Sequence, residues 1–467
     1  MSGLGLALEE IEIDPSSYVD PQGFVFRHDG QIYRCIYNTA SQLFLQLLED
    51  GQLTRWQESL GLVETRKSDL VLKDHPDALI VHHRLISPMT YCVEWCPSML
   101  KDSALSITEL LLDLADHDLT LQDAYPWNIA FDGTNPIYLD LTSIAPANNQ
   151  TIWQAYDQFR AFFLRPLALA YSGNGRVARA LLQDNIGGVT LEEFYGASSA
   201  SYKWLHPGLT VEYALNNYLK RRENIRRSLT KKNNAATRFK VNSQIRHRFF
   251  MKLDKTVRRF KVPPVSDIWK SYYDEIPAEV DTKAKVDAIS QILKKLSPQT
   301  VLDLGCNTGL FSILAAQQGA KTVSVDMSES CIEQLYGYAR KHSLAVTPVV
   351  SNLACPTPPY GFMGKQFPGL LDRVKSDTVL CLAVMHHLHI TARQSFGRIA
   401  DLVSSVTQKN LIFEFVGLDD DNIALLPLAR EIGYSLDTVV TALSRHFSDI
   451  EVQPSDRPTR KLLLCRK

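Results

Sequence analysis

The sequence lacks several features that would assign it to a familiar class of protein. It has no apolar run of about 18 residues, the length that a membrane-spanning helix needs. Its N-terminal segment "MSGLGLALEEIEIDPSS" has no basic stretch before the apolar one, so a signal peptide is not indicated. The eight cysteines form no paired CxxC motifs, which argues against a zinc site and a disulfide framework. We therefore expect a cytoplasmic protein with reduced thiols and no bound metal.

Basic residues are concentrated in one stretch, although the net charge of the 467 residues is only −1. Residues 219–262 hold 16 Lys and Arg against two acidic residues. Three interpretations stay open: a solvated helix face, a surface that attracts an anionic or lipid-linked small molecule, and a nucleic-acid site. The last is less favoured, because the few aromatic residues follow the apolar side of a predicted helix. That helix should begin near Asn242 or Ser243. Its apolar positions are Ile245, Phe249, Leu253, Val257 and Phe260.

The pattern along the chain predicts three regions. Residues 1–150 should form an α+β domain, in which "GFVFRHDGQIYRCIY" predicts a hairpin turning at Asp29-Gly30. In the same region "ALIVHHRLI" and "MTYCVEWC" predict two further strands, and "SALSITELLLDLADHD" predicts an amphipathic helix. Residues 151–264 should form a helical, basic connecting region that ends at Pro263-Pro264.

Residues 265–467 alternate strand and helix patterns, which is typical of a parallel, doubly wound sheet. The last two strands lie close together in the sequence, as in an antiparallel hairpin. We therefore predict an α/β Rossmann-like domain with seven strands. The predicted strands are Thr300–Leu304, Thr322–Asp326, Thr347–Ser351, Thr378–Leu382, Asn410–Phe415, Ile450–Gln453 and Lys461–Cys465.

A small-residue turn follows the first of these strands, in the string "VLDLGCNTGLFS". A phosphate-binding loop of the Walker type needs Gly-Lys-Ser/Thr, and a dinucleotide fingerprint needs three glycines spaced GxGxxG. The turn has neither, since only Gly305 and Gly309 are present. Asp303 at the strand end would also repel a pyrophosphate, whereas it would suit a cation or a ligand that carries amino groups.

Asp326 ends the next strand, where a carboxylate can accept hydrogen bonds from both hydroxyls of a ribose. The predicted ligand therefore contains a ribose, tolerates a nearby acid and allows a close approach of the backbone. S-adenosylmethionine meets these conditions, because it joins adenosine to a sulfonium and an amino-acid tail without a phosphate.

Longer strings resemble a known family. "VLDLGCNTGLFSILAAQQGAKTVSVDMS" resembles the first motif and the acidic loop of class I S-adenosylmethionine-dependent methyltransferases. "DTVLCLAVMHHLHIT" and "LIFEFVGLDD" are similar to the fourth and fifth strands of that fold. Together with "EWCPSMLKDSALSITELLLDLADHDLTLQDAYPWNIAFDGTNPIYLDLTSI", they make most of the chain similar to the bacterial nodulation-protein-like (NoeA-like) methyltransferases.

The resemblance implies roles for particular residues. The backbone from Asp303 to Gly309 would line the methionine tail and the ribose, Asp326 would hold the ribose, and Asn352 would meet the adenine amino group. Ala383 and Val384 would border the sulfonium. The full set of implied cofactor residues is Asp303, Gly305, Cys306, Asn307, Thr308, Gly309, Asp326, Met327, Asn352, Leu353, Ala383 and Val384.

A general base is needed only if the methyl acceptor loses a proton in the transition state. The candidates follow or end predicted strands, at the edge where such sheets bind ligands. They are His386, His387, His389 and Glu414. The hypothesis is that His386 or His387 is the base, and the alternative is that these histidines only begin a helix. Glu414 is either a structural acid or a contact to the substrate.

The string "LQDAYPWNIAFDGTNPIYLDLTS" places Asp123, Asn128 and Asp140 at a spacing that resembles aminoglycoside-phosphotransferase-like kinases. The glycine-rich loop and the lysine strand of such kinases are missing, and Arg34 is the nearest basic residue. We therefore expect a degenerate kinase-like module. The alternatives are an active phosphotransferase and an unrelated α+β domain.

The overall prediction is a methyltransferase (EC 2.1.1.-) that uses S-adenosylmethionine to methylate O or N of a small molecule or glycoconjugate. An RNA methyltransferase that uses the basic stretch is one alternative, and it lacks an Asn-Pro-Pro-Tyr string at the fourth strand. The other alternative is a binding protein whose two modules are both inactive. Neither the acceptor nor the oligomeric state follows from the sequence.

Overall fold

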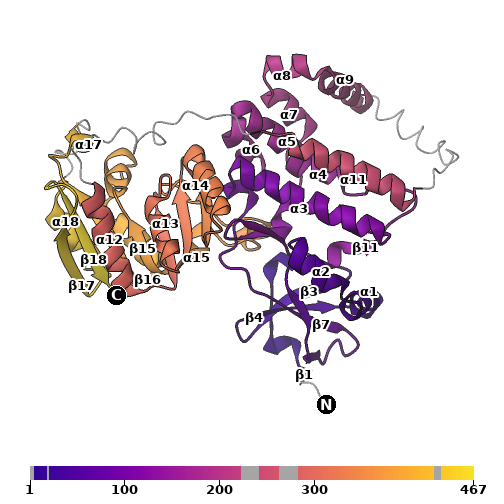
Figure 1. The fold of residues 1–467 in the computed structure, drawn as a ribbon, viewed down its shortest axis with the longest axis horizontal. Coiled ribbons are helices and arrows are strands. Elements are labelled where there is room, and N and C mark those ends of the chain that lie inside the picture. The colour runs from indigo at the N-terminus through magenta and orange to yellow at the C-terminus, as the bar shows by residue number, and fades with distance from the viewer. Residues whose placement is uncertain (1–4, 18–19, 222–240, 262–281, 425–432) are drawn as a thin grey trace.

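The computed structural model describes residues 5–17, 20–221, 241–261, 282–424 and 433–467. The two largest sheets lie side by side in it, one in the N-terminal part and one in the C-terminal part of the chain (Figure 1). The predicted boundary at residue 264 and the central basic residues 222–240 lie outside the described residues. In the part of the chain that is described, no helix is long and apolar enough to cross a membrane.

The N-terminal sheet has five antiparallel strands in the order β2-β3-β4-β7-β5. The predicted hairpin is confirmed, since β3 and β4 pair around Asp29 and Gly30, whose φ angles of 49° and 71° give the left-handed turn. The strands are β2 (Glu12–Ile13), β3 (Gly23–His28), β4 (Gln31–Ile36), β5 (Thr65–Lys67) and β7 (Leu79–His83). Helices α1 (Asn38–Glu49) and α2 (Gln52–Ser59) follow β4, and β1 (Gly5–Leu6) pairs with β6 (Val71–Leu72).

The predicted strand in "MTYCVEWC" is wrong. Residues Cys92–Glu94 form a 3-10 turn, and all three are buried. Glu94 explains the difference, because its carboxylate accepts a hydrogen bond from the backbone N–H of Tyr91 at 3.0 Å and pairs with Arg373 from the C-terminal part. The apolar alternation therefore reflects burial against a second part of the protein and not a strand.

The predicted amphipathic helix is confirmed as α3 (Pro97–Asp116), which is the central helix of the N-terminal part. After it, β8 (Leu119–Leu121) pairs with β11 (Ile144–Pro146), and β9 (Ile129–Asp132) pairs with β10 (Asn135–Tyr138). The short 3-10 helix Pro126–Asn128 lies between β8 and β9.

The middle of the chain is helical. The elements are α4 (Tyr156–Phe159), α5 (Arg165–Leu169), α6 (Gly175–Leu181), α7 (Leu191–Ala197), α8 (Ala200–Leu205), α9 (Pro207–Arg221) and α11 (Ser243–Arg258). Helix α11 begins as predicted, since the side chain of Asn242 accepts the N–H of Ile245 at 3.0 Å. It lies against α3, and its apolar residues Phe250, Leu253 and Val257 are buried there.

The C-terminal sheet has seven strands in the order β14-β13-β12-β15-β16-β18-β17. Only β18 runs antiparallel to its neighbours, in the hairpin with β17. The strands are β12 (Thr300–Leu304), β13 (Lys321–Asp326), β14 (Val346–Val350), β15 (Ser376–Cys381), β16 (Thr407–Val416), β17 (Asp449–Pro454) and β18 (Arg460–Arg466). The helices are α12 (Thr282–Leu296), α13 (Leu310–Gln317), α14 (Glu329–Lys341), α15 (Leu370–Arg373), α16 (Phe396–Val406), α17 (Asp421–Ala424) and α18 (Leu436–Leu443).

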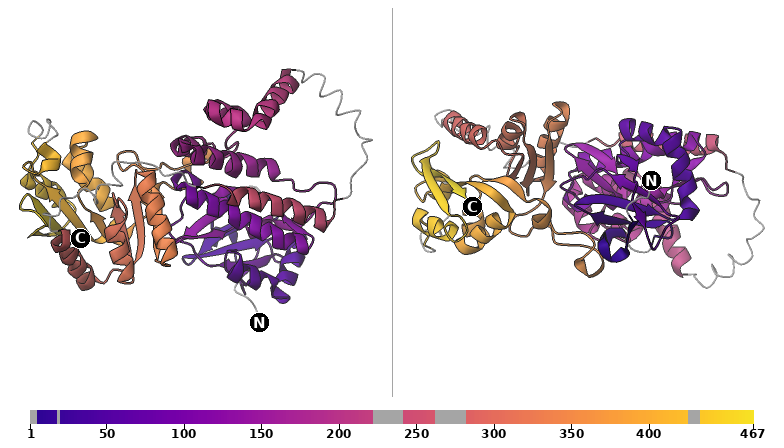
Figure 2. Two further views of the ribbon diagram at one scale, coloured as in Figure 1. Left: turned by 45° about the horizontal axis from the view of Figure 1, so that its top comes forward. Right: turned by 90° about the horizontal axis from the view of Figure 1, so that it is seen from below.

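One apolar core joins the two parts of the chain. It extends from Trp56 and Trp95 in the N-terminal part to Ile332 and Leu335 of α14 and Val350 of β14. Both views in Figure 2 show the C-terminal sheet beside the N-terminal part. Helix α14 contacts α3, and β14 contacts the 3-10 turn Cys92–Glu94. A second core lies inside the C-terminal sheet and its own helices.

Candidate functional site

The small-residue turn begins where β12 ends at the centre of the C-terminal sheet. Val301, Leu302 and Leu304 are almost fully buried, which fixes the strand between the two helical layers. The chain then turns sharply, because Gly305, Asn307 and Gly309 have φ angles of 73°, 52° and 84°. The backbone N–H groups of Gly305 and Cys306 both donate to the carbonyl of Val325, at 2.8 and 3.1 Å.

Asp326 fixes the rest of this turn. One carboxylate oxygen accepts the N–H of Asn307 at 2.8 Å, and the other accepts the N–H of Ser328 at 2.8 Å. The side chain of Asn307 accepts the N–H of Thr308 at 2.6 Å. Asp326 therefore holds the loop after β12 and the loop after β13 together, which places both at the carboxyl edge of the sheet.

The end of β15 closes the other side of the turn. A Cβ atom on Gly305 would lie 2.1 Å from Cγ2 of Val384, so only glycine allows this approach. Ala383, just before it, has a φ of 54°, an uncommon value for a residue with a side chain. A Cβ atom on Gly309 would lie 2.4 Å from Leu335 of α14. The structure thus brings together the glycines, Asp326, Ala383 and Val384, as the sequence predicts.

Asp303 does not present a free carboxylate. It is almost fully buried and accepts a hydrogen bond from the hydroxyl of Ser312 in α13 at 2.6 Å. Burial raises the pKa of Asp303 to about 6. Cys306 is buried as well, and burial holds the pKa of its thiol well above the ordinary value, so the thiol is protonated at neutral pH.

The predicted adenine contacts follow β14, whose end pairs with Asp326. The side-chain oxygen of Asn352 accepts the N–H of Ala354 at 2.9 Å and so caps a tight turn. Leu353 is buried, whereas the side chain of Met327 is 63% exposed. The oxygen assigned to the adenine amino group therefore already supports the loop, with one lone pair left for a ligand.

The three histidines after β15 have different surroundings. His386 is buried, and its Nδ1 has no hydrogen-bond partner among the described residues. Burial lowers its pKa to about 3. His387 is half-buried, and burial lowers its pKa from the ordinary value. His389 stacks on Phe396 with ring centroids 3.8 Å apart, and its Nδ1 lies 2.7 Å from the carbonyl of Gln394. His389 therefore belongs to the local packing.

Glu414 forms a buried ion pair that the sequence does not reveal. Its carboxylate is fully buried, lies 2.5 Å from Nζ of Lys285 in α12 and accepts the hydroxyl of Ser455 at 2.7 Å. The ammonium group of Lys285 also lies 5.3 Å from the ring centre of Phe311 in α13. Nothing in the amphipathic pattern of α12 distinguishes Lys285 from its exposed lysines, so only the structure identifies it.

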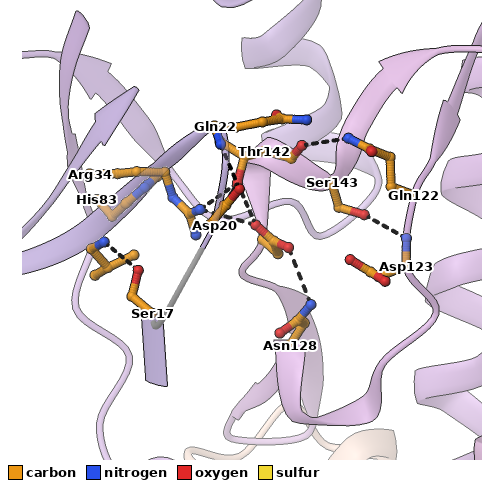
Figure 3. A network of polar contacts seen from close by, with 12 residues as sticks. Ser17, Asp20, Gln22, Arg34, His83, Gln122, Asp123, Asn128, Thr142 and Ser143 are labelled. Atoms are coloured by element: carbon orange, nitrogen blue, oxygen red, sulfur yellow. Dashed lines mark hydrogen bonds and ion pairs between the residues drawn. The ribbon is translucent and has the colours of Figure 1, made fainter. Parts of the chain in front are cut away.

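A second polar site lies in the N-terminal part (Figure 3). Arg34 of β4 pairs with Asp140 at 3.1 Å and donates to the hydroxyl of Thr142 at 2.5 Å. The amide of Asn128 donates to the other oxygen of Asp140 at 3.3 Å, and Thr142 donates to Asp20 at 3.2 Å. Asp123 lies next to this network, as Figure 3 shows.

The charge of that network is mostly negative. The pKa of Asp123 is raised by burial and by the nearby charges of Asp140 and Asp20. Arg34 is buried and compensates only part of this charge. The three residues of the predicted kinase-like spacing, Asp123, Asn128 and Asp140, are therefore close together. Among the residues that the structure describes, no group of three or more His, Cys, Asp or Glu side chains fits a metal ion.

Comparison with known proteins agrees with the C-terminal fold. Residues 278–426 match the family described as "Methyltransferase domain". "Nodulation protein NoeA" of Rhizobium meliloti (strain 1021) is 27% identical over 443 residues, which cover 92% of this chain and 90% of that protein. The predicted resemblance to class I methyltransferases of the NoeA-like kind is thereby confirmed.

Two solved structures are similar over less than half of this chain. The bifunctional kinase-methyltransferase WbdD is 16% identical, with 43% of this chain and 46% of that chain covered and a TM-score of 0.30. Magnesium protoporphyrin IX methyltransferase (ChlM) from Synechocystis PCC 6803, solved with bound SAH, is 17% identical, with 46% and 94% covered and a TM-score of 0.29.

Proposed function

We propose that the protein is a methyltransferase that transfers a methyl group from S-adenosylmethionine to O or N of a small molecule or glycoconjugate. The observation that carries the proposal is Asp326. Its carboxylate ends β13, holds the turn after β12 and stands where a ribose with two free hydroxyls would be bound.

The turn fits a cofactor without phosphate. A phosphate cradle needs several backbone N–H groups directed at the ligand. Here the N–H groups of Gly305 and Cys306 donate to Val325, and that of Asn307 donates to Asp326. The left-handed Gly305 leaves no room for a Cβ atom, because the side chain of Val384 packs against it, and this contact fixes the turn beside the end of β15. These features support adenosine and a cationic tail over a dinucleotide.

When bound, S-adenosylmethionine supplies a methyl group on a positively charged sulfur. The residues of this chain then align the acceptor and exclude water, which is most of what methyl transfer requires. If the acceptor is a hydroxyl, we propose His387 as its general base. His387 is less buried than His386, whose pKa of about 3 is far below the value that suits a base at neutral pH.

The basic stretch supports an acceptor that carries negative charge, such as an acidic or lipid-linked glycoconjugate. A nucleic acid is the less favoured partner, because Phe250 of α11 lies in the core and is not available to stack on bases. We further propose that the N-terminal part is a degenerate kinase-like module. Its five-stranded sheet and the contact of Arg34 with Asp140 support this proposal.

Calorimetric titration with S-adenosylmethionine, S-adenosylhomocysteine, NAD and ATP tests the cofactor. We expect micromolar binding of the first two and none of NAD. Transfer of a labelled methyl group to a bacterial glycolipid or oligosaccharide extract then tests the acceptor class. Failure of both S-adenosyl compounds to bind, with the protein folded, would refute the enzyme and favour a binding protein. Label in RNA alone would favour the nucleic-acid alternative.

A further inference from the structure

The two loops that would contact adenosine are both anchored on the N-terminal part of the chain. The first loop joins β13 to α14, and is flanked by Asp326 at the end of β13 and Glu329 at the start of α14. The second, residues 352–369, follows β14, begins at Asn352 and is here called the β14 hairpin. Both loops lie on the side of the C-terminal sheet that faces the N-terminal part, because β14 is the edge strand there. Their contacts give the N-terminal part a role in the cofactor site.

Aromatic rings hold the β14 hairpin. Tyr360 and Phe367 pair across the hairpin, with both backbone hydrogen bonds between them formed, at 2.9 and 3.1 Å. The ring of Phe367 lies 4.3 Å from that of Trp127, and the ring of Tyr360 lies 5.6 Å from it. Tyr91 contacts Phe367 as well, with centroids 5.6 Å apart. Trp127 is 3% exposed and belongs to the apolar core against which Tyr360 and Phe367 pack.

A buried ion pair reinforces the same contact. Arg373 of α15 pairs with Glu94 at 2.5 Å, and both side chains are buried. The guanidinium group also donates to the carbonyl of Pro368 in the hairpin at 2.9 Å and lies 4.2 Å from the ring centre of Tyr91. A charge pair with such geometry is costly to break once it is buried. The hairpin is therefore held at the Tyr360 and Phe367 pair and at Pro368, near its end.

Helices α3 and α6 hold the loop after β13. Glu329, three residues after Asp326, pairs with Arg179 of α6. A Cβ atom on Gly175 would lie 2.2 Å from the Glu329 carboxylate, so α6 approaches this loop as closely as a glycine permits. One turn further along α14, Glu333 accepts the N–H of Ser98 of α3 at 3.1 Å.

We infer that Trp127 and Arg179 are positioning residues of the cofactor site, which set the affinity for adenosine by fixing the β14 hairpin and the loop after β13. The inference rests on the proposed cofactor. Trp127 also lies in the short turn Pro126–Asn128, next to Asn128, whose amide bonds Asp140. The polar network of the N-terminal part is thus connected to the adenosine side of the C-terminal part through one turn of chain.

Calorimetric titration of the full chain with S-adenosylhomocysteine and with adenosine tests Trp127. We expect Trp127→Phe to weaken both ligands by about three- to tenfold, the range expected for one aromatic contact. Trp153→Phe is the matched control, because Trp153 is also buried in the N-terminal part but packs on Phe159 and Phe250. Adding Phe367→Trp to Trp127→Phe restores ring volume across the contact and should recover most of the affinity, which a local effect on stability would not do.

Arg179→Gln tests the second loop. We expect a similar loss of affinity for both ligands, recovered in Arg179→Lys, which keeps a charge opposite Glu329. Arg160→Gln is the matched control, since Arg160 pairs with Glu212 within the helical region.

The outcomes separate the inference from the proposed function. A wild-type protein that binds neither ligand overturns the proposed cofactor. A wild-type protein that binds, with Trp127→Phe and Arg179→Gln unchanged or no weaker than their controls, overturns the positioning role and leaves the cofactor standing.

Discussion

We expect Asp326→Ala to weaken cofactor binding strongly. The carboxylate would accept hydrogen bonds from two ribose hydroxyls, and each hydrogen bond to a charged group contributes about 1.5–3 kcal/mol. Loss of about 3 kcal/mol corresponds to a dissociation constant that is larger by a factor of about 150. The turn also loses its hydrogen bonds from Asn307 and Ser328, so the binding loop itself is less well held.

Asp377 offers a matched control for this experiment. Its carboxylate also accepts two backbone N–H groups, from Gln299 at 3.1 Å and Thr300 at 3.4 Å. It lies at the amino ends of β12 and β15, which is the opposite edge of the sheet from the glycine turn. We therefore expect Asp377→Ala to lower the thermal stability and to leave affinity for the cofactor unchanged.

The assay is calorimetric titration with S-adenosylhomocysteine, combined with thermal unfolding of each variant. Our reasoning predicts that Asp326→Ala binds at least about 100-fold more weakly than the wild type. Wild-type affinity in a folded Asp326→Ala protein would refute it. So would an equal loss of affinity in Asp377→Ala, because the effect would then come from general loosening of the sheet.

Three further changes test other parts of the site. Gly305→Ala should abolish ligand binding. Gly319 also has a positive φ but has open space around it, so Gly319→Ala should cost only about 1 kcal/mol of stability and leave the affinity for the ligand unchanged. Calorimetry and urea unfolding test both variants. Lys285→Met should destabilise the protein by about 3–5 kcal/mol in urea unfolding, because it leaves Glu414 buried without its cation. Adding Glu414→Leu should recover much of that loss, and equal stability of the single and double variants would contradict the ion-pair argument. Below pH 6.5 His386 is protonated in the unfolded chain but not in the folded protein, where its pKa is about 3, so the free energy of unfolding falls as the pH drops. His386→Gln should make this fall shallower by up to about 1.4 kcal/mol per pH unit. An unchanged slope would contradict the burial of His386 as a neutral group.

Local sequence patterns were sufficient for the centre of the candidate site. Strand β12 and the turn to Gly309 could be predicted because short-range rules govern them: an apolar strand, two glycines at positive φ and a helix that follows directly. Asp326 could be predicted because the end of a neighbouring parallel strand must lie at the same edge of the sheet.

The remaining features depend on partners far away in the sequence. Lys285 and Glu414 are 129 residues apart, and Glu94 and Arg373 are 279 apart. The pattern of apolar residues within α12 or α15 does not indicate which residue will contact such a distant partner. The strand prediction for "MTYCVEWC" is wrong for the same reason. A charged residue, Glu94, is buried in this apolar segment because it pairs with Arg373, a partner far away in the sequence.

The shared apolar core has a consequence for how the chain acquires its structure. During synthesis, Trp95 and Phe131 leave the ribosome long before Ile332, Leu335 and Tyr336 of α14, against which the same core is packed. Until α14 has been synthesised, the apolar surface of the N-terminal part that α14 covers stays exposed to solvent. The last packing step of the N-terminal part is therefore the docking of the newly made C-terminal part. A chain truncated before α14 would keep this apolar face permanently exposed and should aggregate. The two parts therefore depend on each other for folding.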